Sequence, residues 1–492
     1  MIHITGNRFC AAANRSRARV IVPVVLASLV IAAVASGARA GDTAPSNSSP
    51  SVSDLAQQVS ELRELVRQLQ LQVKELQARS QPSANGDVQS AQAATPVDGV
   101  FQAPAWQTTG TAPSPESPKG FNFLYGTTVN FLVDTYYGWN FNEPVGRVNL
   151  LRAYDVLSNA FSLNQADIVL ENAPDPASGK RWGARLDLQY GQATETLQGN
   201  ATNEPRPEIY RNIFQAYGTY VAPIGTGLRI DFGKWASSLG IEGNYVQDQM
   251  NYSRSYWFDF LPFYHMGARV DYQVNDKLGL NYWLVNGTDQ TEPFNGYKDE
   301  LFGFVLQPTK SLNWTVNYYL GQEHADFQFV TNGPPNLPTI QGMPFEPIPN
   351  APNGKLHIFD TYATWNATAK LTFAGEGDYV LERLYTYSKP SHTEGGAAYA
   401  RYQLNSKVAF AARSEYLSDD GGLFSGKTEA LKEVTADFQY KISGNFQMWE
   451  EFRHDWSNQP VFLTSTLFSL SKDQNTAEIG LVWWFGGKQG AW

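Results

Sequence analysis

The chain contains 492 residues, of which 47 are acidic and 37 are basic, and its one cysteine is Cys10. The acidic balance argues against a nucleic-acid-binding protein, which needs a basic surface, and a single cysteine excludes a disulfide framework. Aromatic residues make up 13% of the chain, yet overall hydropathy is negative and no apolar run of helix length follows residue 40. This combination fits a protein that meets lipid through alternate residues of its strands.

The first 40 residues have the pattern of an export signal that is removed. Four arginines precede the apolar run VIVPVVLASLVIAAV (20–34), and Ala38-Arg39-Ala40 has the small-x-small spacing of a signal-peptidase site. The apolar run is shorter than the roughly 20 residues that a membrane-spanning helix needs. An uncleaved N-terminal anchor is the alternative. Removal would leave a chain without cysteine and with 32 basic against 47 acidic residues.

A polar segment, residues 41–50, is expected to be disordered and leads into a heptad pattern over residues 51–79. Valine and leucine alternate there at spacings of three and four through four heptads, beginning with Val52 and Leu55. This pattern predicts a coiled coil. Valine at a and leucine at d favour two strands, but Leu65 at a g position widens the apolar seam, and we favour a trimer because the domain that follows suggests one. A lone amphipathic helix is the alternative.

Residues 80–119 are rich in Pro, Ser, Ala and Gln and are expected to form a flexible linker. From residue 120 to the end, short alternating runs recur between turn signals. In LNWTVNYYL (312–320), for example, apolar and polar residues alternate strictly. Sixteen such runs begin near residues 124, 157, 181, 207, 225, 264, 277, 300, 311, 355, 369, 395, 408, 428, 444 and 474.

The connections between these runs alternate between short and long. The longest lie at about 236–263 and 323–354. Short turns at one end and long loops at the other are typical of an outer-membrane barrel, in which closure pairs every backbone group. We therefore predict an all-β transmembrane barrel of about sixteen antiparallel strands, preceded by an α-helical coiled coil in the periplasm. The tight connections are VNDK (274–277), PTKS (308–311), NATA (366–369), NSK (405–407) and SGN (443–445).

The last run, TAEIGLVWWFGG (476–487), explains why aromatic residues gather near the end of the chain. Its alternate apolar residues would face lipid, and Trp483, Trp484 and Phe485 would meet the membrane interface as part of an aromatic girdle. Gly480, Trp483 and Phe485 also fit the terminal pattern polar-x-Gly-x-x-aromatic-x-aromatic that barrel-assembly machinery reads. The chain departs from the usual form of that pattern because a further segment, GGKQGAW, comes after it. An ordinary aromatic-rich strand is the alternative.

An Arg-x-acid repeat marks the other face of the strands. A spacing of two places both charges of each pair on the same face of a strand. That face should be the inward one, because an Arg facing the lipid midplane costs about 2–4 kcal/mol. The charges either form a wall that sets the field for permeating solutes or an ion ladder across strands that stiffens the barrel. The predicted pore-lining residues are Arg185, Asp187, Arg229, Asp231, Arg269, Asp271, Arg413, Glu415, Glu451 and Arg453, with Asp455 continuing the pattern.

The third long loop, ASSLGIEGNYVQDQMNYSRSYWFDFLP (236–262), mixes charges with many aromatic residues. A long loop with its own packing residues is usually functional. By resemblance to sixteen-stranded porins, we expect it to fold inward and narrow the pore. Packing over the rim or at a subunit contact is the alternative. Its candidate constriction residues are Glu242, Asp248, Arg254 and Asp259.

Residues 121–486 resemble the OmpL-like β-barrel porins. That resemblance implies an outer-membrane channel, but neither a solute nor agreed gating residues. A related similarity is to anion-selective porins with periplasmic coiled coils, and an anion-selective, substrate-specific porin is therefore an alternative function. The segments that carry the main resemblance are FLVDTYYGWNFNEP (131–144), FQAYGTYVAPIGTGLRIDFGKWASSLGIE (214–242), NYSRSYWFDFLPFYHMGARVDYQV (251–274) and LVNGTD (284–289).

An enzyme is disfavoured because no catalytic or metal-ligating constellation is evident. The five histidines after residue 40 are not spaced as metal ligands, and the chain has no G-x-S-x-G motif. We predict a porin that passes small polar or ionic solutes by diffusion, without a cofactor or metal. Its expected partners are outer-membrane lipid, copies of itself, the barrel-assembly machinery and peptidoglycan. A structural or adhesive barrel with a coiled-coil tether is the alternative.

Overall fold

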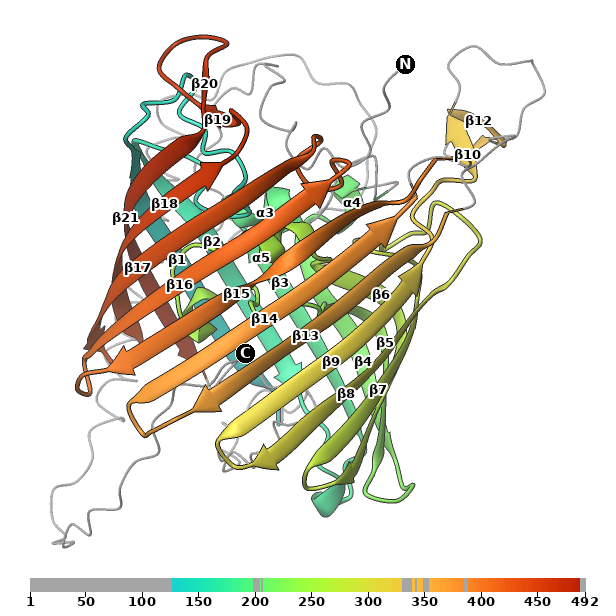
Figure 1. The fold of residues 1–492 in the computed structure, drawn as a ribbon. Helices are drawn as coiled ribbons and strands as arrows, with labels where there is room; N and C mark the ends of the chain where they lie inside the picture. The colour runs from blue at the N-terminus through green and yellow to red at the C-terminus, as the bar shows by residue number, and fades with distance from the viewer. Residues whose placement is uncertain are drawn as a thin grey trace, which may run out of the picture. The chain divides into compact units, whose positions relative to one another are not determined.

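In the computed structural model of this chain, the described residues are 126–197, 204, 207–329, 339–340, 343–347, 354–383 and 388–486. They form a closed barrel of sixteen antiparallel strands, in which β1 pairs with β21 to complete the ring (Figure 1). The predicted barrel is therefore confirmed. The predicted export signal, disordered segment, coiled coil and linker lie outside the described residues.

The barrel strands follow one another in chain order around the ring. Their bounds are β1 Thr128–Asn140, β2 Ala160–Asn172, β3 Trp182–Tyr190, β4 Ile213–Ala222, β5 Leu228–Ala236, β6 Tyr264–Asn275, β7 Leu278–Val285, β8 Asp299–Thr309, β9 Leu312–Gly321, β13 Leu356–Asn366, β14 Leu371–Glu382, β15 Ser391–Gln403, β16 Val408–Asp420, β17 Glu429–Ser443, β18 Phe446–Ser457 and β21 Asp473–Gly486.

Shorter elements lie in the connections. Two small sheets, of order β10-β12-β11 and β19-β20, occupy the β9–β13 and β18–β21 loops and were not predicted from the sequence. These elements are η3 Pro176–Ser178, α3 Gln192–Leu197, α4 Pro207–Tyr210, η4 Val246–Asp248, α5 Tyr256–Phe260, β10 Phe327–Phe329, β11 Thr339–Ile340, β12 Met343–Pro347, β19 Phe462–Leu463 and β20 Leu470–Ser471. No helix among the described residues has the length and apolar character to cross a membrane.

The tight turns form where the sequence predicts them, and asparagine side chains shape two of them. Asn275 Oδ1 accepts a hydrogen bond from the Lys277 N–H at 2.9 Å, and Asn405 Oδ1 accepts one from Lys407 N–H at 2.9 Å. An asparagine that bonds to the backbone two residues on mimics a backbone turn and ends a strand. The alternation of short turns and long loops follows from these local signals.

Burial alternates along each strand, so one set of side chains faces the interior and the other faces outward. On β16 the inward set includes Arg413, Glu415 and Leu417, whereas Phe410 and Tyr416 are exposed on the outside. Charges therefore gather inside and apolar groups outside, the reverse of a water-soluble sandwich.

Aromatic side chains form two bands on the outer face. One row crosses five neighbouring strands in register and consists of Tyr282, Phe302, Tyr318, Phe359 and Tyr379. The other band lies close to the short turns and includes the stacked pairs Phe131–Phe485 at 5.2 Å, Phe446–Trp483 at 4.3 Å and Trp365–Phe373 at 5.9 Å between ring centroids. Such bands are typical of a barrel at the two interfaces of a membrane.

One aromatic prediction needs correction. Trp483 and Phe485 face outward, as predicted, but Trp484 lies on the inner face and packs against a buried cluster that includes Leu132 and Val482. The reason is the strict two-residue period of a strand, which sends neighbours to opposite faces. Trp484 therefore belongs to the interior of the barrel and not to the girdle.

Candidate functional site

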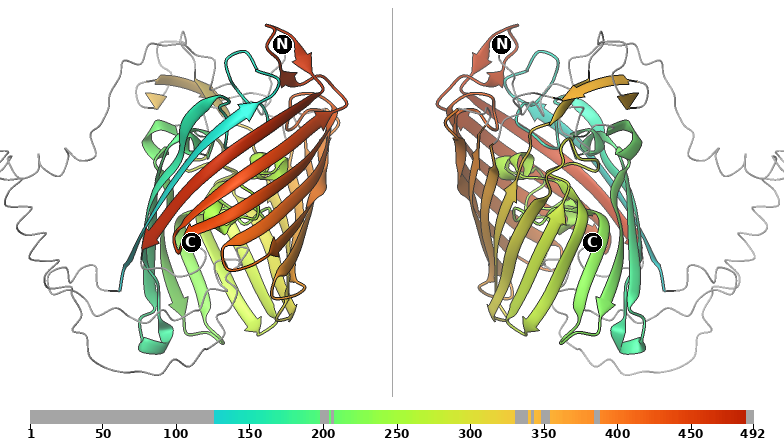
Figure 2. Two further views of the ribbon diagram at one scale, coloured as in Figure 1. Left: turned by 90° about the vertical axis from the view of Figure 1, so that its left-hand side faces the viewer. Right: turned by 90° about the vertical axis from the view of Figure 1, so that its right-hand side faces the viewer.

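The β5–β6 loop, residues 237–263, lies inside the barrel, where its helix α5 is visible between the strands (Figures 1 and 2). Most of its aromatic side chains are buried, with Tyr256 and Trp257 both 0% exposed. The backbone hydrogen bonds of α5 begin at Ser255, whose hydroxyl caps the helix by accepting the N–H of Phe258. This loop therefore occupies the interior that a water-filled barrel would otherwise leave open.

Three tyrosines, which we call the tyrosine anchors, tie this loop to carboxylates on one arc of the barrel wall, which runs from β18 through β21, β1 and β2 to β3. The hydroxyl of Tyr245 donates to Asp187 on β3 at 2.6 Å, and that of Tyr252 donates to Asp134 on β1 at 2.8 Å. Tyr256 donates to Asp455 on β18 at 2.6 Å.

Burial, reinforced by the facing carboxylate, raises the pKa of each tyrosine anchor well above its usual value. The hydroxyls therefore keep their protons and remain donors at physiological pH. Hydrogen bonds to charged acceptors are worth about 1.5–3 kcal/mol each. The three anchors, Tyr245, Tyr252 and Tyr256, hold the loop against the arc of wall between β18 and β3.

Wall carboxylates also accept backbone N–H groups of the loop. Glu415 on β16 accepts from Tyr256 at 2.9 Å and from Trp257 at 2.8 Å. Glu451 on β18 accepts from Tyr252 and Ser253, each at 2.9 Å. These predicted pore-lining acids thus bind the loop itself, and they satisfy backbone groups that a buried loop would otherwise leave unpaired.

Two of the predicted Arg-x-acid pairs form within one strand. Arg185 Nε lies 2.9 Å from Asp187 Oδ1, and Arg229 Nε lies 3.1 Å from Asp231 Oδ1. Arg269 instead pairs across strands with Asp231, at 2.8 Å, although it was predicted to pair with Asp271. The two-residue period places the charges on the right face but leaves the partner open, because the neighbouring strand competes for the guanidinium.

The fourth predicted pair also needs correction, because Arg413 does not take Glu415 as its partner. Arg413 lies 2.6 Å from Glu433 on β17 and 2.8 Å from Glu242 of the loop. Arg453 pairs with Asp455 at 2.7 Å and approaches Glu433 at 3.6 Å. Sequence reasoning missed Glu433, although the alternate polar residues 433, 435 and 437 mark an inward polar stripe on β17.

The four predicted constriction residues have different environments. Glu242 joins the loop to the wall through Arg413 and also accepts the N–H of Ser255 at 2.7 Å. Arg254 is buried and turns back on its own loop, donating to the carbonyls of Gly243, Asn244 and Tyr252. Asp248 is half-buried in η4, and Asp259 is buried in α5.

A second loop adds to the same charge cluster. Arg152, between β1 and β2, lies 2.7 Å from Asp155 in its own loop and 2.9 Å from Asp455 on β18. Both side chains of the Arg152–Asp455 pair are fully buried. Tyr256 of the β5–β6 loop donates to the other oxygen of Asp455. Asp455 on the wall therefore contacts both the β1–β2 loop and the β5–β6 loop.

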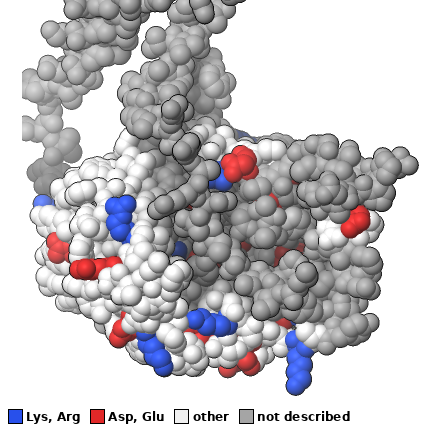
Figure 3. Space-filling model, turned by 90° about the horizontal axis from the view of Figure 1, so that it is seen from above, with Lys and Arg blue, Asp and Glu red and all other residues white. Residues whose placement is uncertain are grey.

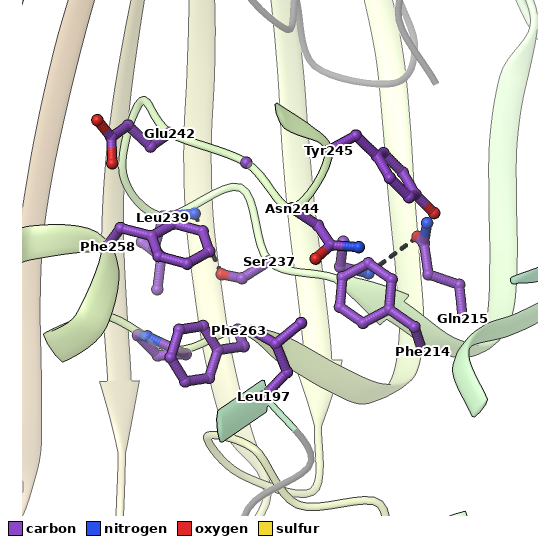
Figure 4. A pocket seen from close by; sticks show the side chains of 13 residues that line it. Leu197, Phe214, Gln215, Ser237, Leu239, Glu242, Asn244, Tyr245, Phe258 and Phe263 are labelled. Carbon is purple, nitrogen blue, oxygen red and sulfur yellow. Dashed lines mark hydrogen bonds between the residues drawn. The ribbon is translucent and has the colours of Figure 1, made fainter. Parts of the chain in front are cut away.

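A small pocket lies where the β5–β6 loop meets β4 and β5 (Figure 4). The rings of Phe214, Phe258 and Phe263 line it, and Leu239 N–H donates to Ser237 Oγ beside them. Its apolar lining indicates packing of the loop against the wall. At the loop end of the barrel, Lys and Arg are interspersed with Asp and Glu over the described part of the face (Figure 3).

Together, these features define the class of protein to which the chain belongs. A closed barrel with aromatic bands outside, charges inside and a long loop folded into its interior is an outer-membrane channel through which small solutes diffuse. A family model described as "Putative beta-barrel porin-2, OmpL-like" matches residues 126–485, and the chain belongs to this family. Comparison with curated proteins finds no match.

Solved structures of similar fold are outer-membrane proteins. The anion-selective porin of Comamonas acidovorans is 8% identical with a TM-score of 0.45, covering 73% of this chain and 99% of its own. The channel DcaP of Acinetobacter baumannii is 9% identical with a TM-score of 0.45, covering 73% and 97%. OmpT of Vibrio cholerae with loop L8 deleted is 10% identical, also at 0.45, covering 73% and 100%. Because these TM-scores lie below 0.5, the assignment rests on the family match and on the barrel itself.

Proposed function

We propose that the solute path runs through the barrel interior beside the β5–β6 loop and that it favours cations. The predicted wall and loop charges would line this path: Arg185, Asp187, Arg229, Asp231, Arg269, Asp271, Arg413, Glu415, Glu451 and Arg453 on the strands, and Glu242, Asp248, Arg254 and Asp259 on the loop. The loop would restrict the path because its tyrosine anchors and backbone contacts reach β1, β3, β16 and β18.

The observation that supports cation preference is a surplus of inward carboxylates. Each of the five inward arginines named above forms an ion pair. By contrast, several buried inward acids have no Lys or Arg partner in the described part of the chain. A lumen with excess negative charge attracts cations and repels anions. These acids are Asp134, Asp360, Glu376, Asp378, Asp437 and Glu451.

The reversal potential of the open channel under a KCl gradient tests this proposal. We expect its sign to show that K⁺ is more permeant than Cl⁻. Replacing Arg185, Arg229 and Arg269 by Ala should increase this preference, whereas the matched triple Lys variant keeps the charge and should leave it unchanged. An anion-selective wild-type channel would refute cation preference, and an unchanged Ala variant would make these arginines structural.

The remaining proposals concern partners and location. We infer a channel without enzymatic activity or cofactor, lying in the outer membrane with its chain ends on the periplasmic side. The predicted coiled coil would then associate subunits, with a trimer favoured, or approach peptidoglycan. Gly480, Trp483 and Phe485 would be read by the barrel-assembly machinery. A structural or adhesive barrel is the alternative, and a folded protein that never conducts would favour it.

A further inference from the structure

Three of the inward carboxylates without a Lys or Arg partner converge on the inner face of β13 and β14. Asp360 faces Asp378 directly across the strand pair, and Glu376 precedes Asp378 by two residues on the same face. One oxygen of each can be chosen so that all three lie within 4.8 Å of one another. The three side chains are between 2% and 9% exposed. The arrangement therefore concentrates negative charge in a place with little water.

Hydrogen bonds satisfy two of the three carboxylates but not the third. Asp360 accepts from Gly240 N–H at 3.1 Å and from the Asn317 amide at 2.7 Å. Glu376 accepts from the N–H of Ile241 at 3.1 Å. Asp378 is 5% exposed, yet neither of its oxygens accepts a hydrogen bond from an N–H or hydroxyl group among the described residues, and the group that it meets is the carboxyl group of Asp360.

No Lys or Arg side chain in the described part of the chain forms an ion pair with any of the three. Burying an ionised carboxylate without a partner is strongly unfavourable, and three together repel one another. One carboxylate oxygen of Asp378 lies within 4.8 Å of one oxygen of each of the other two groups. The cluster thus lacks a positive charge at the point where its oxygens meet.

We propose that Asp360, Glu376 and Asp378 bind a divalent cation, and that Ca²⁺ is the cation they fit. Ca²⁺ takes about 6–8 oxygen ligands in a flexible geometry and accepts carboxylates in one- or two-oxygen binding. The set contains only oxygen donors, which disfavours Zn²⁺. Water from the barrel interior would complete the coordination, whereas Mg²⁺ demands a more regular octahedron.

The cation would also fasten the start of the β5–β6 loop. Two of its three ligands hold the N–H groups of Gly240 and Ile241, and Tyr362 on the same wall donates to the carbonyl of Ser238 at 3.2 Å. Neutralising the repulsion among the carboxylates would keep these acceptors in place. Ca²⁺ would therefore stabilise the folded barrel together with its loop.

The test is Ca²⁺ binding to residues 41–492, refolded in detergent free of lipopolysaccharide and of metal. Isothermal titration with CaCl₂ should show one site, and Ca²⁺ should raise the melting temperature relative to EDTA. Asp378→Asn should weaken binding by about tenfold or more, because a charged carboxylate is replaced by a neutral amide with a single oxygen donor, and should reduce the thermal shift. This readout is separate from ion selectivity, so either proposal can fail alone.

Asp167→Asn is the matched control. Asp167 on β2 is 3% exposed and its oxygens likewise have no hydrogen-bond partner, but it belongs to no such group of three among the described residues. Its variant should bind Ca²⁺ as the wild type does. If Asp378→Asn fails to fold, Glu376→Gln takes its place. Absence of any Ca²⁺-dependent thermal shift in the wild type, or equal loss in both Asp variants, would overturn the proposal and leave carboxyl groups that share protons.

Discussion

The ring of Tyr252, in the β5–β6 loop, packs directly on the backbone of Gly480, in the last strand. A Cβ on residue 480 would overlap the ring carbons of Tyr252. The hydroxyl of the same ring continues to Asp134 on β1, the strand that closes the barrel against β21. Gly480 was predicted as part of an assembly signal, and its packing role gives an independent reason for a glycine at this position.

Gly480→Ala should destabilise the barrel by about 1–3 kcal/mol, the usual cost of overpacking a filled interior. The measurement is urea unfolding of the protein refolded in detergent, where no assembly machinery is present. Gly218→Ala is the control, because a Cβ there meets nothing closer than 4.0 Å. In a protein that already carries Tyr252→Ala, Gly480→Ala should change the free energy of unfolding very little.

The two roles of Gly480 separate in this experiment. Destabilisation of the refolded protein supports the packing role. A variant that is fully stable after refolding but is not inserted into the outer membrane of cells would contradict that role and leave the assembly role alone.

Tyr256→Phe should loosen the β5–β6 loop. The variant removes the 2.6 Å hydrogen bond to Asp455, which also pairs with Arg152 and Arg453. Losing one hydrogen bond to a charged group costs about 1.5–3 kcal/mol. We expect a lower unfolding free energy and larger current fluctuations in single channels.

Tyr137→Phe is the matched control for this prediction. Its hydroxyl also donates to a side chain, Asn159 at 2.9 Å, but on the exposed outer side. The control should change neither quantity. Equal current noise in the Tyr256 variant and the wild type would mean that this anchor does not limit loop motion.

The buried Glu204 should make the stability of the folded protein depend on pH. Its carboxylate is 0% exposed and accepts the N–H groups of Thr291 and Glu292, and burial raises its pKa above the usual value. The folded protein thus binds this proton more tightly than the unfolded chain. The resulting stability is present below the unfolded pKa of about 4.3 and is lost as pH rises through the folded pKa.

Glu204→Gln removes this titration. Its melting temperature should therefore improve relative to the wild type as pH rises above about 4.3. The exposed Glu208→Gln, which loses only a surface pair with Arg211, should show no such trend. A difference for Glu204→Gln that stays constant with pH would contradict the assignment.

Deleting residues 51–79 tests the predicted coiled coil, which lies outside the described residues. Four heptads of Val and Leu should hold subunits together, so the deletion should reduce the oligomer or release the protein from the cell wall. Light scattering of the detergent complex and a peptidoglycan pull-down measure the two effects. If neither changes, the coiled coil has been misassigned.

Local sequence patterns were sufficient to predict where the strands lie, but not which side chains of different strands and loops contact one another. The predicted run near residue 264 begins at Tyr264, and the one near 408 begins at Val408, because alternation and turn residues are short-range signals. The run expected near 207 begins later, at Ile213, since Pro207–Tyr210 forms the short helix α4. Element ends depend on such competing local structures.

In the candidate site, the orientation of the side chains could be predicted from the sequence, but their partners could not. That Arg269 and Arg413 face inward follows from the two-residue period, but their partners Asp231 and Glu433 depend on strand register. That Glu415 would bind backbone N–H groups of α5 could not be predicted, because the contact joins residues about 160 positions apart. Inward orientation is a local property, whereas ion-pair partners are a property of the closed barrel.

The most direct test of the account is the single-channel conductance of residues 41–492 in planar bilayers, compared with a variant in which residues 244–255 are replaced by a short Gly-Ser linker. We expect discrete current steps for the full chain and larger steps for the variant, because the β5–β6 loop fills part of the barrel interior. A folded wild-type barrel without current steps, or steps of equal size in both proteins, would contradict it.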